Sequence, residues 1–423
     1  MASDNALWEI IRPALVRLGL YTVSDPTFGR YNLPIHPPHK KLVDDPNVAH
    51  TWRRVFLPPE SSFESLQEAY DTTEILYAED VTLQPQEIES GLQRGGRWIC
   101  YSIWEMVNAP SGGWEGGGKG KGKDLVLVHG LSDYGLRYAP HIPHFLKAGF
   151  RVIVPDLPSY GRSTGVHSFL PSLLLLSAAL HVVLTDTVMR DLDGGRKQSK
   201  VFLSGASMGG WAVLYYLLKY PPTPSATAVA AAANEHDVPP PDGKGYRKLE
   251  KHKGDEKHRI QIAGAFVLCP MVEVSKNSRP SILVEGFARV LKFFAPTLPL
   301  AKAVRGNVSD DPRVEEDFYA DVLCYHRWLR VGTGLALLEG MIELEKRAGE
   351  IDVPIRLVHG TSDRVTSHLG TLKLFDRLPN ADKECQLYEG YEHVMIKEGI
   401  DAADDEKRQR VLADWRSWLL QRC

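Results

Sequence analysis

The sequence has few cysteines and no long uninterrupted hydrophobic run. Its five cysteines are scattered and odd in number, which argues against a disulfide framework and suits a reducing compartment. No stretch is apolar enough to span a bilayer, and the first twenty residues mix charged with apolar positions, unlike a secretory leader. A net charge of −3 gives no electrostatic reason to expect nucleic acid as a partner. We therefore expect a soluble, cytoplasmic protein.

Hydrophobic residues make up 43% of the 423-residue chain, enough for a sizeable core. Short apolar segments alternate with longer helical patterns, which predicts right-handed βαβ crossovers and a mostly parallel sheet flanked by helices. An alternating pattern at 97–106 predicts one earlier antiparallel strand. The other predicted strands lie at 124–128, 151–155, 201–206, 261–269, 354–358 and 385–388, and the predicted helices at 138–148, 173–192 and 405–420.

The alternation of predicted strands and helices divides the chain into an extension, a core and an inserted cap. Residues 1–90 are predicted to form an extension that wraps the core, and residues 91–270 and 352–423 form the core itself. Within it, 221–260 is rich in alanine, proline and charge, which predicts a disordered insertion. Between 271 and 351 the strand rhythm stops, and the apolar stretch at 281–300 predicts an inserted helical cap or lid.

The pattern Gly205-x-Ser207-x-Gly209 lies between a predicted strand and a predicted helix. In this context G-x-S-x-G marks a nucleophile elbow, where the serine occupies a sharp, strained turn. Glycines on both sides let the strand and the helix pass closely. Ser207 is therefore the predicted nucleophile.

A serine hydroxyl needs a base within hydrogen-bond reach, and that base needs a carboxylate to orient it. Asp363 and His393 each follow a predicted strand and complete the chain order Ser…Asp…His. Asp156 lies upstream of the nucleophile, while His129 and His359 precede glycines and are interpreted as supports of turns. The predicted triad is Ser207, Asp363 and His393.

Acyl transfer also requires donors for the oxyanion that forms on the attacked carbonyl. The residue after the nucleophile, Met208, supplies one backbone N–H, and Leu131 in the loop after the strand at 124–128 supplies the other. This chemistry needs neither a metal nor an organic cofactor. Two motifs are interpreted as chance matches. Residues 113–119 match the G-x-x-x-x-G-K pattern of a phosphate-binding loop, but no helix is predicted after them. His36 and His39 could begin a metal site, but no further cysteine or acidic ligand lies nearby.

In the predicted cap, Phe287, Leu291 and Phe294 fall on one helical stripe and are candidates for binding an apolar substrate. A cap above the nucleophile would exclude water from the reaction. Its apolar character also makes it the candidate surface for peripheral contact with a membrane or lipid droplet.

Four motifs together resemble the monoacylglycerol lipase branch of α/β-hydrolases, also called the serine aminopeptidase-like group. They are HGLSDYGLRY at 129–138, GASMGG at 205–210, HGTSDRVT at 359–366 and GYEHVMIKE at 390–398. The resemblance implies the α/β-hydrolase fold with an eight-stranded core, a mobile apolar cap and cleavage of esters that bear an acyl chain. It also supports Leu131 and Met208 as oxyanion donors.

Two departures from that branch concern the polar end of the substrate pocket. The first loop carries Ser132, Asp133 and Tyr134 at its centre, although Arg137 keeps its place, and Ile396 stands where animal monoacylglycerol lipases have a second histidine. These positions are predicted to bind the substrate at that end of the pocket.

The sequence thus predicts a serine hydrolase that cleaves carboxylic esters through an acyl-enzyme. Monoacylglycerol or another medium-to-long acyl ester is the first candidate substrate, and a lactone, xenobiotic or secondary-metabolite ester is the second. A ligand-sensing scaffold without turnover and an acyltransferase remain open, whereas Ser207 excludes the hydrolases that use an aspartate nucleophile.

Overall fold

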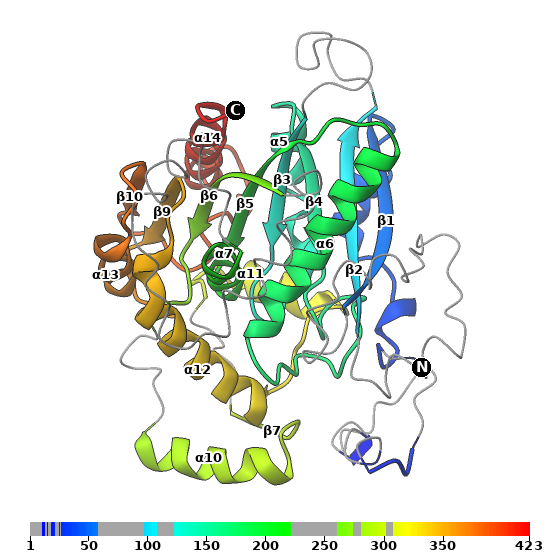
Figure 1. Ribbon diagram of the computed structural model, residues 1–423, viewed down its shortest axis with the longest axis vertical. Helices are drawn as coiled ribbons and strands as arrows, with labels where there is room; N and C mark the ends of the chain where they lie inside the picture. Colours follow the sequence, from blue (N-terminus) through cyan, green and yellow to red (C-terminus); the bar gives the residue numbers. More distant parts are fainter. Residues whose placement is uncertain are drawn as a thin grey trace, which may run out of the picture.

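The computed structural model describes residues 27–57, 97–107, 122–220, 260–273, 281–301 and 308–423, together with a few positions before residue 27. An eight-stranded sheet forms the centre of this part of the chain, in the order β1-β2-β4-β3-β5-β6-β9-β10 (Figure 1). The first two strands run antiparallel to their neighbours and the remaining pairs are parallel. The predicted insertion at 221–260 and the start of the extension lie largely outside the described residues.

The strands of this sheet are β1 (Val48–Leu57), β2 (Arg97–Met106), β3 (Lys123–Val128), β4 (Arg151–Pro155), β5 (Lys200–Ala206), β6 (Gln261–Leu268), β9 (Ile355–Gly360) and β10 (Lys383–Tyr388). The α-helices are α2 (Pro37–Val43), α5 (Ile142–Leu146), α6 (Leu174–Asp193), α7 (Met208–Lys219), α10 (Ile282–Phe294), α11 (Pro312–Ala320), α12 (Val331–Arg347), α13 (His368–Arg377) and α14 (Glu406–Leu420). Three 3₁₀ turns and a short ribbon complete the described elements: η1 (Arg30–Asn32), η3 (Gly135–Tyr138), η7 (Ala348–Glu350), β7 (Pro299–Ala301) and β8 (Leu329–Arg330).

The central strands are apolar on both faces because helices cover both sides of the sheet. Successive side chains of a strand point to opposite faces, so Val126 and Val128 of β3 join one core while Leu125 and Leu127 join the other. Helices α6, α7, α12 and α13 pack on the first side, and α5 and α14 on the second. The carboxyl ends of the parallel strands therefore meet at one edge, where the loops that follow them gather.

The N-terminal segment differs from its prediction. Strand β1 belongs to the sheet and pairs with β2 along its whole length, from Val48 opposite Met106 to Leu57 opposite Arg97. The core thus begins well before residue 91, and the prediction that residues 1–90 only wrap it is wrong for this strand. Arg53 and Arg54 interrupt the apolar pattern of β1, which explains why the sequence concealed it.

Between β6 and β9 the described chain is mainly helical. Helix α12 packs against α7 and against α10, and Figure 1 shows α10 at the end of the molecule farthest from the sheet. The predicted helix at 281–300 ends at Phe294, and the chain continues into β7, which pairs with β8. Among the described helices, none combines the length and the apolar character required to cross a bilayer.

Candidate active site

Ser207 lies on a sharp turn between β5 and α7. Its backbone has φ 56° and ψ −120°, a left-handed conformation that costs free energy for a residue with a side chain. Hydrogen bonds hold the turn on both sides: the Ser207 N–H donates to Leu268 O at 3.1 Å, and the Ser207 carbonyl accepts from Trp211 and Met271 at 3.0 Å. The strained serine is thus fixed by its neighbours.

The glycines of this motif are required by close backbone contacts. A Cβ on Gly209 would lie 2.1 Å from Val128 O, and a Cβ on Gly205 would lie 2.6 Å from the backbone of Gly209. Neither position can accept a side chain without separating β5, β3 and α7. The spacing G-x-S-x-G is therefore a packing requirement of this turn.

Asp363 and His393, from loops after β9 and β10, meet as predicted from the chain order. His393 Nδ1 lies 2.7 Å from Asp363 Oδ2, and the Asp363 side chain is fully buried. The backbone N–H groups of Val365 and Thr366 donate to Asp363 Oδ1 at 2.7 and 3.0 Å. Ser207 and His393 line the same cavity.

The charges at this pair are set by its neighbours. Burial by itself would raise the pKa of Asp363, but hydrogen bonds from His359 and His393 lower it, so the carboxylate is ionised. Burial opposes the charged form of His393, yet the Cys269 sulfur and the Asp363 carboxylate raise the pKa of this ring well above its ordinary value. The pair has the electrostatics of a base oriented by a carboxylate.

One residue at this site was given only a turn-supporting role from the sequence. His359 is fully buried at the end of β9, and its Nε2 lies 3.1 Å from Asp363 Oδ2. The same Asp363 oxygen therefore faces two imidazole rings. The spacing His-x-x-x-Asp after a strand was the only signal in the sequence that pointed to this contact.

His129 holds the loop after β3 in place through two hydrogen bonds. Its Nδ1 lies 2.8 Å from Gly130 O, and its Nε2 accepts the Leu157 N–H at 2.9 Å. Burial lowers the pKa of His129 to about 4, so the ring is neutral and Nδ1–H donates. Because a trans peptide points its N–H opposite its carbonyl, this bond directs the Leu131 N–H away from His129. Leu131 lines the cavity beside Ser207.

The polar residues predicted to contact the substrate divide into two groups. Ser132, Asp133 and Arg137 line the cavity. Tyr134 does not: it is fully buried and bonds His39 Nδ1 at 3.0 Å and Asp321 Oδ2 at 2.9 Å. Tyr134 therefore joins α2 and the end of α11 to this loop, a structural role that replaces the predicted one.

The two histidines rejected as a metal pair, His36 and His39, lie at helix α2. His36 precedes the helix and its Nε2 lies 2.8 Å from Asp317 Oδ1, while Arg137 reaches the other Asp317 oxygen at 2.6 Å. Helix α11 is thus fastened to the N-terminal segment and to the loop after β3. Burial lowers the pKa of His39 to about 3, so this ring is neutral.

The cavity has a volume of about 930 Å³, within the usual range for pockets that bind small organic ligands. Its wall has an apolar part from the segment between β6 and β9, and a charged part near the loop after β3 and the loop that follows His393. The apolar part includes Phe287, Leu300, Leu329, Leu335, Leu338 and Met341, and the charged part Asp133, Arg137, Asp311, Arg313 and Lys397.

Of the three apolar cap residues predicted for the substrate, the structure places one at the cavity. Phe287 lines it, whereas Leu291 and Phe294 are absent from its wall, and Phe294 is 73% exposed. The predicted stripe on α10 points partly to solvent because this helix packs mainly on α12. Ile396 lines the cavity, as expected for a position three residues after His393.

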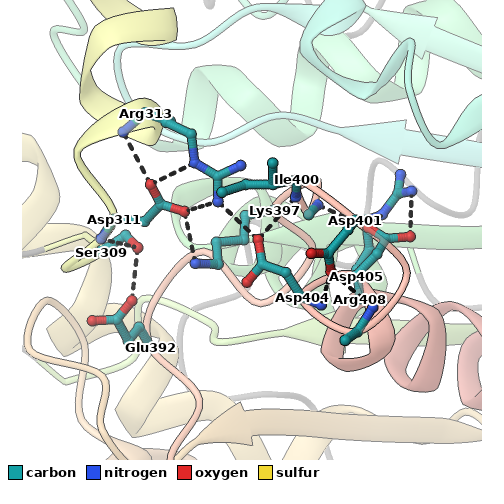
Figure 2. Close-up of polar contacts among 12 residues, drawn as sticks. Ser309, Asp311, Arg313, Glu392, Lys397, Ile400, Asp401, Asp404, Asp405 and Arg408 are labelled. Atoms are coloured by element: carbon teal, nitrogen blue, oxygen red, sulfur yellow. Dashed lines mark hydrogen bonds and ion pairs between the residues drawn. The ribbon is translucent and has the colours of Figure 1, made fainter.

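A network of ion pairs joins the loop of His393 to the start of α11 (Figure 2). Ser309 Oγ donates to Glu392 Oε2 at 2.7 Å, and Lys397 Nζ lies 2.9 Å from Asp311 Oδ2. Arg313 contacts Asp311 and bonds Asp404 Oδ2 at 2.8 Å. These contacts lie before and after His393 along the chain, and they link its loop to the start of α11, in the segment between β6 and β9 that lines the cavity.

Within the described residues, one group of side chains has the composition of a metal site. Single ligand atoms of Cys269, Asp363 and His393 lie within 4.8 Å of one another. Two of these residues already bond each other, since His393 Nδ1 lies 2.7 Å from Asp363 Oδ2. The donor set therefore matches a histidine oriented by a carboxylate better than an ion site.

The sheet order, the strained serine at the end of β5 and the cavity at the carboxyl edge define the α/β-hydrolase fold. The same fold is found in a soluble variant of monoglyceride lipase from Saccharomyces cerevisiae in complex with a substrate analog, with a TM-score of 0.56 and 17% identity. That comparison covers 77% of this chain and 92% of the other.

Residues 121–252 and 251–399 match the sequence profile of the family described as serine aminopeptidase, S33, and the chain belongs to this family. It is 26% identical over 337 residues to a monoacylglycerol lipase of Mycolicibacterium smegmatis, covering 77% of this chain and 94% of the relative. It is 25% identical over 305 residues to a caffeoylshikimate esterase of Arabidopsis thaliana, covering 70% and 76%.

Proposed function

We propose that this protein, a carboxylic ester hydrolase by its family and relatives, works through an acyl-enzyme on Ser207. The observation that carries the proposal is the pairing of a strained serine with a carboxylate-bound histidine in one cavity. A base of raised pKa in the same cavity as a serine on a strained turn is the arrangement that nucleophilic catalysis requires.

In the proposed reaction His393 takes the Ser207 proton as the hydroxyl oxygen attacks the ester carbonyl. The backbone N–H groups of Leu131 and Met208 stabilise the oxyanion, and His393 then protonates the leaving alcohol. Water, activated by the same ring, attacks the acyl-enzyme and releases the acid. Asp363 holds the tautomer of the ring and stabilises its charged form.

A monoacylglycerol or another medium-to-long acyl ester is the proposed substrate. The apolar wall of the cavity suits an acyl chain, and the charged wall suits a hydrophilic leaving group. The relative in Mycolicibacterium smegmatis is named for monoacylglycerol cleavage, which supports the same choice.

An ester with a bulky or cyclic leaving group, including a lactone or a plant-type secondary metabolite, is the second candidate. Ile396 and the charged residues Asp133 and Arg137 at the cavity wall favour it, as does the relative named caffeoylshikimate esterase. At this end of the cavity an apolar side chain and two charged ones stand together, in place of the second histidine of animal monoacylglycerol lipases.

Labelling with a fluorophosphonate probe, with Ser207→Ala as the control, tests the nucleophile. Turnover is then compared between p-nitrophenyl esters of rising chain length, monoacylglycerols and bulky lactones. Rates that rise with acyl length support the first substrate class, and rates confined to cyclic or aromatic esters support the second. Product analysis with added alcohols separates hydrolysis from acyl transfer. If Ser207 is labelled but no ester is turned over, the protein is better explained as a ligand-sensing scaffold. If no labelling depends on Ser207, the proposed catalytic role is wrong.

We further propose that α10 brings the enzyme to its substrate at a membrane or lipid-droplet surface. Leu283, Phe287, Phe293 and Phe294 are all more than half exposed on this helix. Large exposed apolar patches mark interaction surfaces, and this one adjoins the cavity through Phe287. The free thiols of Cys100, Cys269 and Cys324 support a location in the cytoplasm.

A further inference from the structure

Asp363 Oδ2 is shared by two imidazole rings. His393 Nδ1 lies 2.7 Å from this oxygen and His359 Nε2 lies 3.1 Å from it, while Thr366 Oγ1 donates to it at 2.9 Å. The second ring has no exposure to solvent. Three donors on one oxygen exceed what is needed to orient a single histidine, so the role of His359 requires an explanation.

The protonation state of His359 follows from its hydrogen-bond partners, which are Asp363, Thr371 and, at 3.3 Å from Nε2, Thr366 Oγ1. An ionised carboxylate only accepts hydrogen bonds, so Nε2 must carry the proton that faces Asp363. Nδ1 lies 2.7 Å from Thr371 Oγ1 on α13, and this hydroxyl can donate to it. Burial lowers the pKa of His359, which favours the neutral ring. His359 is thus a neutral donor to Asp363 rather than a second positive charge.

The position of this donor has two consequences for the carboxylate. With backbone N–H groups on Oδ1 and side chains on Oδ2, Asp363 cannot rotate, and Oδ2 stays directed at His393. Since a donor to the carboxylate withdraws part of its charge, His359 also weakens the pull of Asp363 on the Nδ1 proton of His393. Both effects act through Asp363, because His359 faces Asp363 and Thr371 rather than the cavity.

We propose that His359 is a positioning residue that fixes the Asp363 carboxylate and moderates the basicity of His393. The proposal rests on the proposed function of Ser207, Asp363 and His393. The titratable groups around His359, Asp363 and His393 include Cys269 beside His393, Asp133, whose carboxylate interacts electrostatically with His393, and His368 on α13, whose ring centre lies 6.3 Å from that of His359.

The test compares His359→Leu, which removes the donor, with His359→Gln, whose side-chain amide places an N–H near the position of Nε2. We expect kcat of His359→Leu to fall about 10- to 100-fold with KM changed by less than about twofold, because the reacting groups lose alignment and the cavity does not change. The acidic limb of kcat/KM moves to higher pH by about half a unit to one unit. His359→Gln restores most of the rate and the position of the limb.

His368→Gln is the matched control, since it removes a neighbouring titratable ring without removing a donor to Asp363. His368→Gln should leave the acidic limb of the pH profile of kcat/KM at its wild-type position. Equal losses in His359→Leu and His359→Gln, with no movement of the limb, would reduce His359 to a packing residue and overturn the proposal. Wild-type kinetics in His359→Leu would overturn it as well.

A measurement without catalysis separates this proposal from the proposed function. In Ser207→Ala protein with isotope-labelled histidines, magnetic resonance follows the titration of His393 directly. His359→Leu in that background should raise the pKa of His393, even if no ester were ever found to be cleaved. An unchanged titration overturns the proposal, whereas a wild-type enzyme without Ser207-dependent turnover overturns only the proposed function.

Discussion

Two apolar helices of similar length have opposite surroundings in this molecule. Helix α7, which follows Ser207, is buried along its length up to Leu218. Helix α10 leaves Leu283 85% exposed and Phe293 and Phe294 each 73% exposed. In Figure 1, α7 lies against the sheet, whereas α10 is separated from the sheet by α12.

The difference shows that apolar composition predicts burial only when the fold supplies a surface to pack against. Helix α7 belongs to a βαβ crossover, so the sheet and its neighbours α6 and α12 must cover it. Helix α10 follows β6 outside that rhythm and packs on one helix. The apolar residues of α7 therefore stabilise the fold, and the exposed ones on α10 are available to a ligand or a surface.

The largest expected effect comes from the residue that begins α7. Ser207→Ala should lower ester hydrolysis by about 10⁴-fold or more, because no other group replaces the nucleophile. Steady-state rates and fluorophosphonate labelling measure this loss. An unchanged melting temperature would show that the fold is retained, and persistent turnover would place the chemistry elsewhere.

Within α7, Trp211→Ala should reduce the free energy of unfolding by about 3–5 kcal/mol. The indole is fully buried and its Nε1–H donates to Gly340 O of α12 at 2.9 Å, so truncation leaves a cavity and removes a hydrogen bond between the two helices. Urea denaturation measures the change. A loss below about 1 kcal/mol would contradict the view that α7 is part of the rigid core.

The pH dependence of kcat/KM should follow His393 and should not respond to a change of charge on α10. Protonated His393 cannot accept the Ser207 proton, so kcat/KM falls about tenfold per pH unit below the pKa of this ring. Because that pKa is raised, we expect the acidic limb above pH about 6.5. Arg289→Gln on α10 is the control, and a shifted limb in that variant would mean that α10 is coupled electrostatically to the site.

A smaller effect is expected where the start of α11 meets the loop of His393. Lys397→Met removes the pairing with Asp311 and should lower kcat/KM about two- to tenfold, with a dependence on salt weaker than in the wild type. Lys373→Met, which removes an exposed pair with Glu273, is the matched control and should have no effect. If the two variants had the same kcat/KM and the same dependence on salt, the network of Figure 2 would have no role in positioning His393.

The smallest effect on stability is expected on α10. Phe293→Ser and Phe294→Ser should change the free energy of unfolding by less than about 0.5 kcal/mol each, since both rings are exposed. Together they should weaken binding to phospholipid vesicles and slow hydrolysis of emulsified esters, with little change on short esters in solution. Sedimentation with vesicles measures the binding. A large loss of stability, or unchanged vesicle binding, would contradict the proposed surface role.

The sheet was largely predictable because its signals are local. Each parallel strand is a short apolar run, and each member of the candidate triad (Ser207, Asp363 and His393) comes directly after one, so position alone made them candidates. Strand β1 was missed because Arg53 and Arg54 break its apolar pattern. Arg54 is buried in the fold and lies over the Tyr31 ring at 4.7 Å, a contact that no periodicity reveals.

By itself, the sequence determined the strand–helix rhythm, the serine elbow with its two glycines and the chain order of the candidate triad. These depend on backbone geometry and on apolar patterns within a few residues. Only the tertiary structure decided that Tyr134 is buried, that α10 is exposed and that His359 shares the carboxylate of Asp363. Such features depend on groups brought together from distant parts of the chain, and the free energy of each contact depends on partners that the local sequence does not contain.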